Sequence, residues 1–162
     1  MKKSITVRPI CVTDEPFLFR LFCSAREHQF ASPGIPLDQK EQLMQMQFQA
    51  QQQQYRGQFP NAEFDLVLNN DVPVGNFYTL RGPGEFVLID ITLLPEHRNG
   101  GIGARLVQDL IAQANSENEP LSAHVLKDNP AWRLWQRLGF CLVNDDGMYL
   151  RIEVPLEIDR NS

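Results

Sequence analysis

The pattern of apolar and polar positions predicts a strand and two helices in the first third of the chain. Alternation over residues 5–10 predicts a short strand, which Pro9 places near an edge or an end of a sheet. Residues 13–25 open with Thr-Asp-Glu-Pro, the residue types of a helix start, and continue with Phe and Leu at helical spacing. The glutamine-rich segment 38–55 has the composition of a disordered tract. Phe48 and other apolar residues on one helical face favour a second amphipathic helix instead.

The remainder of the chain reads as strands and helices in alternation. Two strands at 63–69 and 74–80 flank an Asn-Asp turn and predict a hairpin. Residues 86–94 are almost all apolar, which predicts a central strand buried on both faces. The elements expected after it are a helix at 103–114, a strand at 121–126, a short helix at 130–138 and a hairpin of strands at 140–143 and 148–154. We therefore expect a single α/β (α+β) domain over residues 1–162.

Composition narrows the possible partners and compartment. The chain carries 20 acidic and 15 basic residues, a formal net charge of −5, which argues against nucleic acid or a membrane surface as a partner. Cys11, Cys23 and Cys141 are odd in number and widely spaced, so they predict neither a disulfide framework nor a metal site. No apolar run suits a signal peptide or a membrane span. We expect a cytoplasmic protein without metal.

The segment from Leu93 to Ala104 is the most informative stretch of the sequence. A buried strand runs into a glycine-rich turn that opens a helix, so backbone N–H groups and the positive end of the helix dipole converge there. Gly100, Gly101 and Gly103 allow a ligand to approach the backbone, and Arg98 adds a charged donor. Such a loop suits a phosphate or pyrophosphate, although a glycine turn can also simply join strand to helix. Neither a dinucleotide G-x-G-x-x-G motif nor a Walker loop is present.

Two motifs in this order resemble the GNAT superfamily of N-acetyltransferases. Arg98-Asn99-Gly100-Gly101-Ile102-Gly103 matches the [QR]-x-x-G-x-[GA] loop of that family. The second motif is similar to V…N-x-A-x-x-L-Y-x-x-x-G-F and comprises Val125, Asn129-Pro130-Ala131, Leu134-Trp135 and Leu138-Gly139-Phe140. The resemblance covers residues 74–154 well. It implies a mixed, mostly antiparallel sheet of about six to seven strands, with helices on both faces and a splay between the central strands.

The resemblance also implies a set of cofactor-binding residues for acetyl-coenzyme A (acetyl-CoA). The main chain of Leu93 would pair with the pantetheine arm as an added strand. The pyrophosphate would be held by Arg98 and by the N–H groups of the loop, which come from Gly100, Gly101, Ile102, Gly103 and Ala104. Asn129 would hold the pantetheine or the reacting end of the cofactor.

Trp135 stands where the family commonly has a tyrosine that protonates the departing thiolate. An indole N–H cannot usefully exchange a proton near neutral pH, so we expect Trp135 to pack and to orient the cofactor rather than to act as an acid. The thiolate of coenzyme A is a fairly good leaving group, and the Leu93 N–H can stabilise an oxyanion.

The acceptor amine must lose a proton, and two residues are candidate bases. Asp90 lies in the apolar strand before the loop, where a carboxylate is costly unless it is paired or functional. His124 lies in the strand expected across the splay and has an ordinary pKa suited to base work. Each also has a plain structural interpretation, as a hydrogen-bonded acid and as a half-exposed strand histidine. Glu85, Glu96 and Tyr149 are weaker candidates for helpers, and we expect Cys141 to be a small buried residue.

The resemblance to the GNAT superfamily implies direct transfer of an acetyl group from acetyl-CoA to a primary amine of a small molecule or peptide. The acceptor groove is expected between the 38–55 helix, the loop before it and the 144–147 hairpin turn, with Gln51 and Tyr55 as candidate lining residues. An alternative is a non-catalytic acyl-CoA sensor or partner subunit with the same fold, and a third is an unrelated phosphate-binding domain. Whether the chain forms a homodimer stays open.

Overall fold

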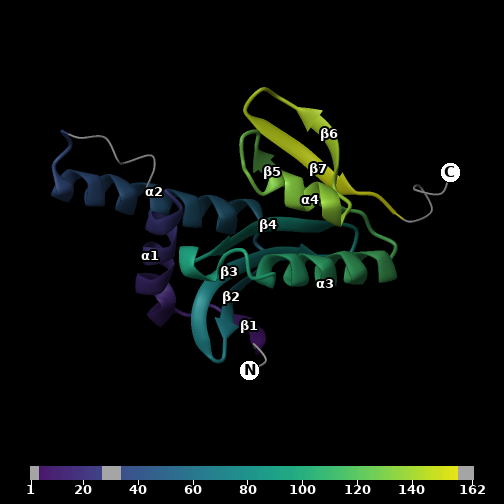
Figure 1. The fold of residues 1–162 in the computed structure, drawn as a ribbon, viewed down its shortest axis with the longest axis horizontal. Coiled ribbons are helices and arrows are strands. Elements are labelled where there is room, and N and C mark those ends of the chain that lie inside the picture. Colours follow the sequence, from purple (N-terminus) through teal and green to yellow (C-terminus); the bar gives the residue numbers. More distant parts are fainter. Residues whose placement is uncertain (1–3, 27–33, 157–162) are drawn as a thin grey trace. The chain divides into compact units, whose positions relative to one another are not determined.

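The computed structural model describes residues 4–26 and 34–156, which form one seven-stranded sheet and four α-helices (Figure 1). The strands are β1 (Ile5–Pro9), β2 (Glu63–Asn69), β3 (Val72–Arg81), β4 (Phe86–Leu93), β5 (Leu121–Leu126), β6 (Cys141–Asp145) and β7 (Tyr149–Val154). The α-helices are α1 (Glu15–Ala25), α2 (Leu37–Gln58), α3 (Ile102–Ser116) and α4 (Trp132–Leu138). Two short 3₁₀ helices in the described ranges are η1 (Val12–Asp14) and η3 (Pro95–His97).

The strands are hydrogen-bonded in the order β1-β2-β3-β4-β5-β7-β6. β1 with β2, β5 with β7 and β6 with β7 are antiparallel, whereas β4 and β5 are parallel because α3 connects them. The predicted mixed, mostly antiparallel sheet is therefore confirmed. By its contacts the chain divides into two compact units, one of residues 1–77 and 91–98 and the other of residues 78–90 and 99–162.

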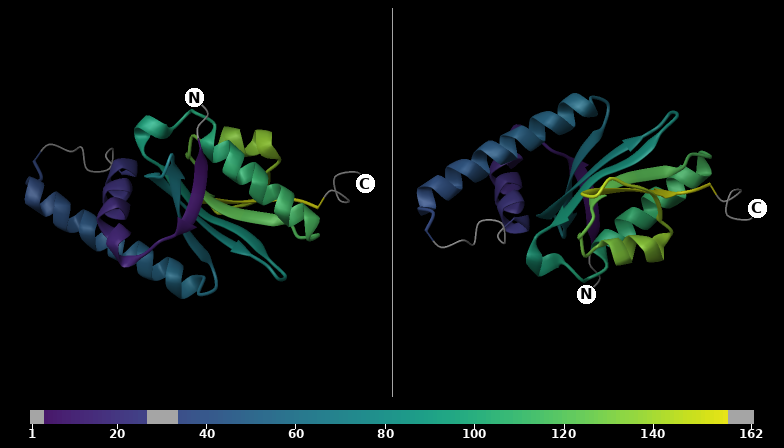
Figure 2. Two further views of the ribbon diagram at one scale, coloured as in Figure 1. Left: turned by 90° about the horizontal axis from the view of Figure 1, so that it is seen from below. Right: turned by 90° about the horizontal axis from the view of Figure 1, so that it is seen from above.

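In the first unit, α1 and α2 pack on one face of β2. Phe48 of α2 is 1% exposed, and the rings of Phe19 and Phe22 meet it edge-on at centroid distances of 5.5 and 5.6 Å. Leu66 and Leu68 complete this cluster from the strand side. Most glutamines of α2 are exposed. α2 crosses α1 in both views of Figure 2. The predicted amphipathic helix is confirmed, because Phe48 anchors it.

β1 shows why a proline is tolerated in this strand. Ile10 N–H donates to Phe64 O and Asn70 N–H donates to Ser4 O, so the even-numbered residues of β1 turn their backbone groups toward β2. Pro9 is odd-numbered and occupies a position whose N–H would point away from β2, so no ladder hydrogen bond is lost. The prediction that Pro9 marks an edge is confirmed, since β1 ends the strand order.

In the second unit, the pairing of β4 with β5 is short. It runs from Phe86↔Leu121 to Leu88↔Ala123, whereas β5 pairs with β7 over its whole length. Phe86, Val87 and Leu88 are accordingly buried, and the rest of β4 is only half-buried. The expectation that this strand is buried on both faces is therefore wrong for its second half, because β5 leaves it there. The predicted splay lies at this point.

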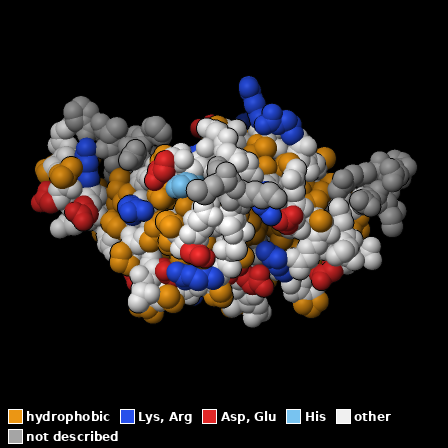
Figure 3. Space-filling view, turned by 60° about the horizontal axis from the view of Figure 1, so that its bottom comes forward, with side chains coloured by type: hydrophobic (Ala, Val, Ile, Leu, Met, Phe, Trp, Pro, Cys, Tyr) orange, Lys and Arg blue, Asp and Glu red, His pale blue; other side chains and the backbone are white. Residues whose placement is uncertain are grey.

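β6, the other end of the strand order, is exposed along its whole length. Cys141 is exposed, so the expectation of a buried cysteine is wrong: its strand has a neighbour on one side only and no layer over this residue. On the face shown in Figure 3, acidic and basic side chains are interspersed among apolar ones. No helix in the described ranges is long and apolar enough to cross a membrane.

Candidate active site

The connection from β4 to α3 forms a sharply turned loop. After η3, Arg98 is extended, Asn99 has a φ of 63°, and Gly101 has a φ of 84° at the N-cap of α3. Glycine adopts the left-handed region without steric cost and asparagine tolerates it, which explains Gly101 and Asn99. The helix begins at Ile102, one residue before the predicted start.

The first turn of α3 presents backbone donors that nothing in the helix uses. No side chain caps the N-terminus of α3, because its N-cap residue is Gly101. The first helical hydrogen bond runs from Arg105 N–H to Gly101 O at 3.0 Å. The N–H groups of Ile102, Gly103 and Ala104 therefore have no acceptor within the helix. A Cβ built on Gly101 would meet no atom within 4 Å, so the space in front of it is open. Uncapped donors facing open space at a helix N-terminus suit an anionic group.

Leu93 at the end of β4 offers its backbone on the side away from β3. Leu94 N–H donates to Val74 O at 2.9 Å, so the backbone groups of Leu94 face β3 and those of Leu93 face the opposite way. The Leu93 carbonyl accepts a hydrogen bond from Arg98 Nε at 3.0 Å. The Leu93 N–H is thus the group in position to donate to a ligand, and Arg98 lies next to it.

Gly75 of β3 fixes the position of Leu93, and the sequence analysis missed it. A Cβ at Gly75 would lie 2.3 Å from the Thr92 carbonyl oxygen and 2.7 Å from Leu93 Cδ2. Only glycine allows β3 to approach β4 this closely. A glycine inside an apolar strand is the sequence signal that indicates such an approach.

Asn129 is part of the turn before α4. Its Oδ1 accepts from Ala131 N–H at 2.9 Å, and its own N–H donates to Leu126 O at 3.0 Å. These bonds orient the side chain and leave its NH₂ group as the part that can reach a ligand.

Trp135 is buried in α4. It is 6% exposed, its ring meets Phe140 edge-on at a centroid distance of 6.3 Å, and its carbonyl accepts from Phe140 N–H. The geometry is that of a packing residue, which anchors the strand that follows the helix.

The two candidate bases emerge on opposite faces of their strands. Leu88 and Ala123 are register partners in a parallel pair and share a face. Asp90 follows Leu88 by two residues and stays on that face, whereas His124 follows Ala123 by one and points to the other. Asp90 is half-buried and His124 is exposed. The structure therefore does not bring the two candidates together.

The helper candidates are all exposed: Glu85, Glu96 and Tyr149. Asp146, in the turn between β6 and β7, interacts electrostatically with His124. The pKa of Asp146 is lowered chiefly by hydrogen bonds from the N–H groups of Tyr149 and Met148, with a smaller contribution from His124. Among the described residues, no group of His, Cys, Asp and Glu could hold a metal ion.

The comparisons with known proteins identify the family. The family model described as acetyltransferase (GNAT) family matches residues 27–140, more than half of the chain. This chain belongs to the acetyltransferase (GNAT) family. Membership supports acetyl-CoA-dependent acyltransferase activity in general and removes the alternative of an unrelated phosphate-binding domain. No curated protein sequence matches the chain.

Solved GNAT structures share the fold over nearly the whole chain. The PaiA N-acetyltransferase of Thermoplasma acidophilum, in complex with coenzyme A, has a TM-score of 0.69 at 16% identity and covers 94% of this chain and 99% of its own. An acetyltransferase of Thermus thermophilus has a TM-score of 0.67 at 21% identity, covering 94% and 97%. A GNAT acetyltransferase of Elizabethkingia anophelis with bound acetyl-CoA has a TM-score of 0.62 at 16% identity, covering 96% and 100%. At these identities the likeness establishes the fold.

Proposed function

We propose that this protein transfers the acetyl group of acetyl-CoA directly to a primary amine of a small molecule or peptide. The observation that carries the proposal is the uncapped first turn of α3 behind the left-handed Gly101, which opens directly from β4. The family match and the neighbours with coenzyme A or acetyl-CoA support this ligand. The acceptor class rests on the chemistry of the family and has no residue assigned to it.

The residues present fit acetyl-CoA. The free N–H groups of Ile102, Gly103 and Ala104 suit a pyrophosphate, and Gly101 leaves room for it. Arg98 is exposed, lies four residues before Ile102 in the chain and would add a charged donor. The Leu93 backbone faces away from β3 and suits pairing with the amide groups of the pantetheine arm. Asn129 would add a donor from its NH₂ group.

The chemistry supplied by the bound thioester is an activated acetyl carbonyl. The amine nitrogen forms a bond to this carbon, the carbon–sulfur bond breaks, and the thiolate takes a proton from solvent. The Leu93 N–H is the donor in position to stabilise the oxyanion. Trp135 cannot supply the proton, because an indole is a donor only and this one is packed against Phe140. A base, Asp90 or His124, would accept the proton of the amine.

A second candidate function is a non-catalytic acyl-CoA sensor or partner subunit. Trp135 favours it, since the position that commonly carries the acid in the family holds a buried packing residue here. Both functions require cofactor binding, and only the enzyme requires amine-dependent release of thiol.

The test measures free thiol released from acetyl-CoA in the presence of pooled polyamines, amino acids and short peptides, corrected for the cysteines of the protein. The enzyme predicts release that needs an amine and is lost in Gly101→Glu, because a carboxylate would fill the space in front of the uncapped donors. The matched control is Gly84→Glu, since Gly84 has a φ of 89° with nothing within 4 Å but lies in the turn before β4. Desulfo-CoA binding without any amine-dependent release would favour the sensor. Equal loss of binding in both variants would contradict the assigned site.

The pH dependence of the rate distinguishes the two bases. Because Asp90 and His124 lie on opposite faces, only one can meet the acceptor. We expect the inflection on the acidic side to disappear in either Asp90→Asn or His124→Gln, while the other variant keeps it. Loss of the inflection in both variants would contradict the face assignment.

A further inference from the structure

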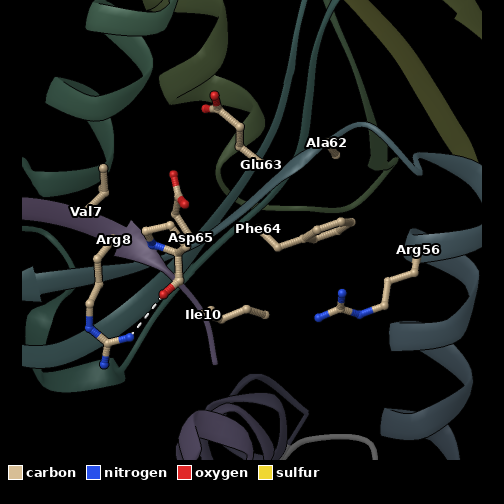
Figure 4. Close-up of a pocket in the computed structure, with 9 residues that line it drawn as sticks. Val7, Arg8, Ile10, Arg56, Ala62, Glu63, Phe64 and Asp65 are labelled. Atoms are coloured by element: carbon tan, nitrogen blue, oxygen red, sulfur yellow. Dashed lines mark hydrogen bonds between the residues drawn. The ribbon is translucent and has the colours of Figure 1, made fainter. Parts of the chain in front are cut away.

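A hollow lies within the first unit, where β1 ends and β2 begins. It has a volume of about 500 Å³ and lies between the end of β1, the start of β2 and Arg56 near the end of α2 (Figure 4). Binding sites for small molecules usually have volumes of about 300–1,000 Å³. The hollow is therefore large enough for a small organic ligand.

This hollow lies at the β1–β2 edge of the sheet, two strands away from β4 and the Leu93 backbone. Pro9 pairs with Asp65 beside the hollow, and Ile5 pairs with Asn69 at the other end of β1 and β2. β3 lies between β2 and β4 in the strand order, and Leu94 N–H donates to Val74 O on the β3 side of β4. Neighbouring strands of a sheet lie about 4.8 Å apart, so β2 and β4 are separated by about 10 Å. A ligand here would not occupy the proposed acetyl-CoA site.

Arg56 gives the hollow a cationic side. Its guanidinium lies over the Phe64 ring, 5.0 Å from the centroid, and the two side chains point toward one another in Figure 4. Stacking uses the face of the guanidinium and leaves its in-plane N–H donors available. Among the residues that the structure describes, no carboxylate pairs with Arg56. Arg8, which also lines the hollow, is held by Asp14 through two hydrogen bonds of 2.8 and 2.9 Å.

The walls of the hollow near Phe64 are apolar, and the wall away from Arg56 is acidic. Ile10 and Ala62 lie near Phe64 and provide apolar surface. Glu63 and Asp65 flank Phe64 in β2, and their side chains point away from it and from Arg56 (Figure 4). The guanidinium of Arg56 suits a single carboxylate, which it can bind with two parallel N–H groups. The nearby carboxylates of Glu63 and Asp65 disfavour a more highly charged anion.

We infer that this hollow binds a small organic monocarboxylate with an aromatic or branched aliphatic body. The carboxylate accepts from the Arg56 guanidinium, and the body covers Phe64, Ile10 and Ala62. The site is separate from the acetyl-transfer site, and its assignment is independent of the proposed function.

The test follows the backbone amides of the full-length protein by NMR while phenylacetate is added. We expect saturable shifts at Ile10, Ala62 and Phe64. Phenylacetamide, which has the body without the charge, and acetate, which has the charge without the body, should bind at least about tenfold more weakly. Equal binding of phenylacetate and phenylacetamide, or no saturable shift, overturns the inference.

Variants separate recognition by Arg56 from a general effect of charge. Arg56→Gln should weaken phenylacetate binding by about tenfold to a hundredfold without unfolding the protein, since this side chain is exposed. Arg20→Gln is the matched control, because Arg20 is exposed and lies over Phe17 at 5.5 Å outside the hollow. An equal loss in the two variants overturns the inference, as does displacement of phenylacetate by desulfo-CoA.

Discussion

Replacing Gly75 by alanine perturbs the closest approach between β3 and β4. The new Cβ would lie 2.3 Å from the Thr92 carbonyl oxygen, 2.7 Å from Leu93 Cδ2 and 3.2 Å from Leu93 Cα. The Thr92 oxygen belongs to the backbone, so the strands must separate by at least about 0.7 Å to reach the 3.0 Å that real contacts respect. Overpacking of this kind costs about 1–3 kcal/mol.

The stability loss should appear in thermal unfolding. For a chain of this length each kcal/mol lowers Tm by about 2–4 °C, so Gly75→Ala should lower Tm by about 2–12 °C. The matched control is Gly57→Ala: Gly57 lies in the last turn of α2, with nothing within 4 Å of a new Cβ. There alanine should raise stability by about 0.5–1 kcal/mol, because it is the better helix former.

The same change should reduce catalysis more than it reduces stability. Leu93 is the proposed oxyanion donor, and a misplacement of about 1 Å in an active site can cost a hundredfold in rate. We expect kcat to fall at least about tenfold at a temperature where Gly75→Ala is fully folded, with little change in the KM for the amine. A variant with wild-type Tm and kcat would refute the close approach and the role given to the Leu93 backbone.

Three other predictions test separate parts of the structure. The hydrogen bond from the Arg8 guanidinium, together with the Cys11 N–H, holds the pKa of Asp14 well below its ordinary value, so this carboxylate stabilises the fold at neutral pH. Asp14→Asn weakens these hydrogen bonds and should therefore cost about 0.5–2 kcal/mol in urea unfolding at pH 7. The difference between wild type and variant in the free energy of unfolding should shrink as the pH falls below about 4. A difference independent of pH would contradict this role of the Asp14 carboxylate. Trp135→Phe should lower Tm but leave the pH profile of kcat unchanged, because Trp135 packs rather than donates a proton; a lost basic limb would disprove this. Burial, with a smaller contribution from Glu41, raises the pKa of the Cys23 thiol. Cys23 should therefore react with a disulfide reagent more slowly than the two exposed thiols, Cys11 and Cys141. Cys23→Ser should remove only the slow phase of this reaction.

Local patterns predicted most of the elements because local physics determines them. The turn at Asn70 and Asp71 has φ values of 52° and 67°, as expected for residue types that tolerate the left-handed region. Phe48 identified α2 correctly within a glutamine-rich segment, because one apolar face is enough to anchor a helix. The start of α4 was placed two residues too early, at Pro130 rather than Trp132, because Asn129 forms a turn first.

Features that depend on strand register could not be predicted from the sequence. The half-burial of Asp90 follows from the end of the β4–β5 pairing at Leu88, which no local pattern records. The separation of Asp90 and His124 onto opposite faces follows from the same register. Cys141 is of a residue type that is usually buried, but it is exposed because it lies on β6, a strand at the end of the sheet. Residues 27–33, which precede α2 in the chain, lie outside the described residues, so the acceptor groove stays a prediction.

The central claim is direct acetyl transfer to an amine, and one measurement tests it most directly. The protein is incubated with isotopically labelled acetyl-CoA and the pooled amines, and free thiol and labelled N-acetyl product are quantified together. The account predicts equal molar amounts of the two, formed only when an amine is present. Thiol released without a labelled amide, or an amide formed equally well by Gly101→Glu, would contradict it.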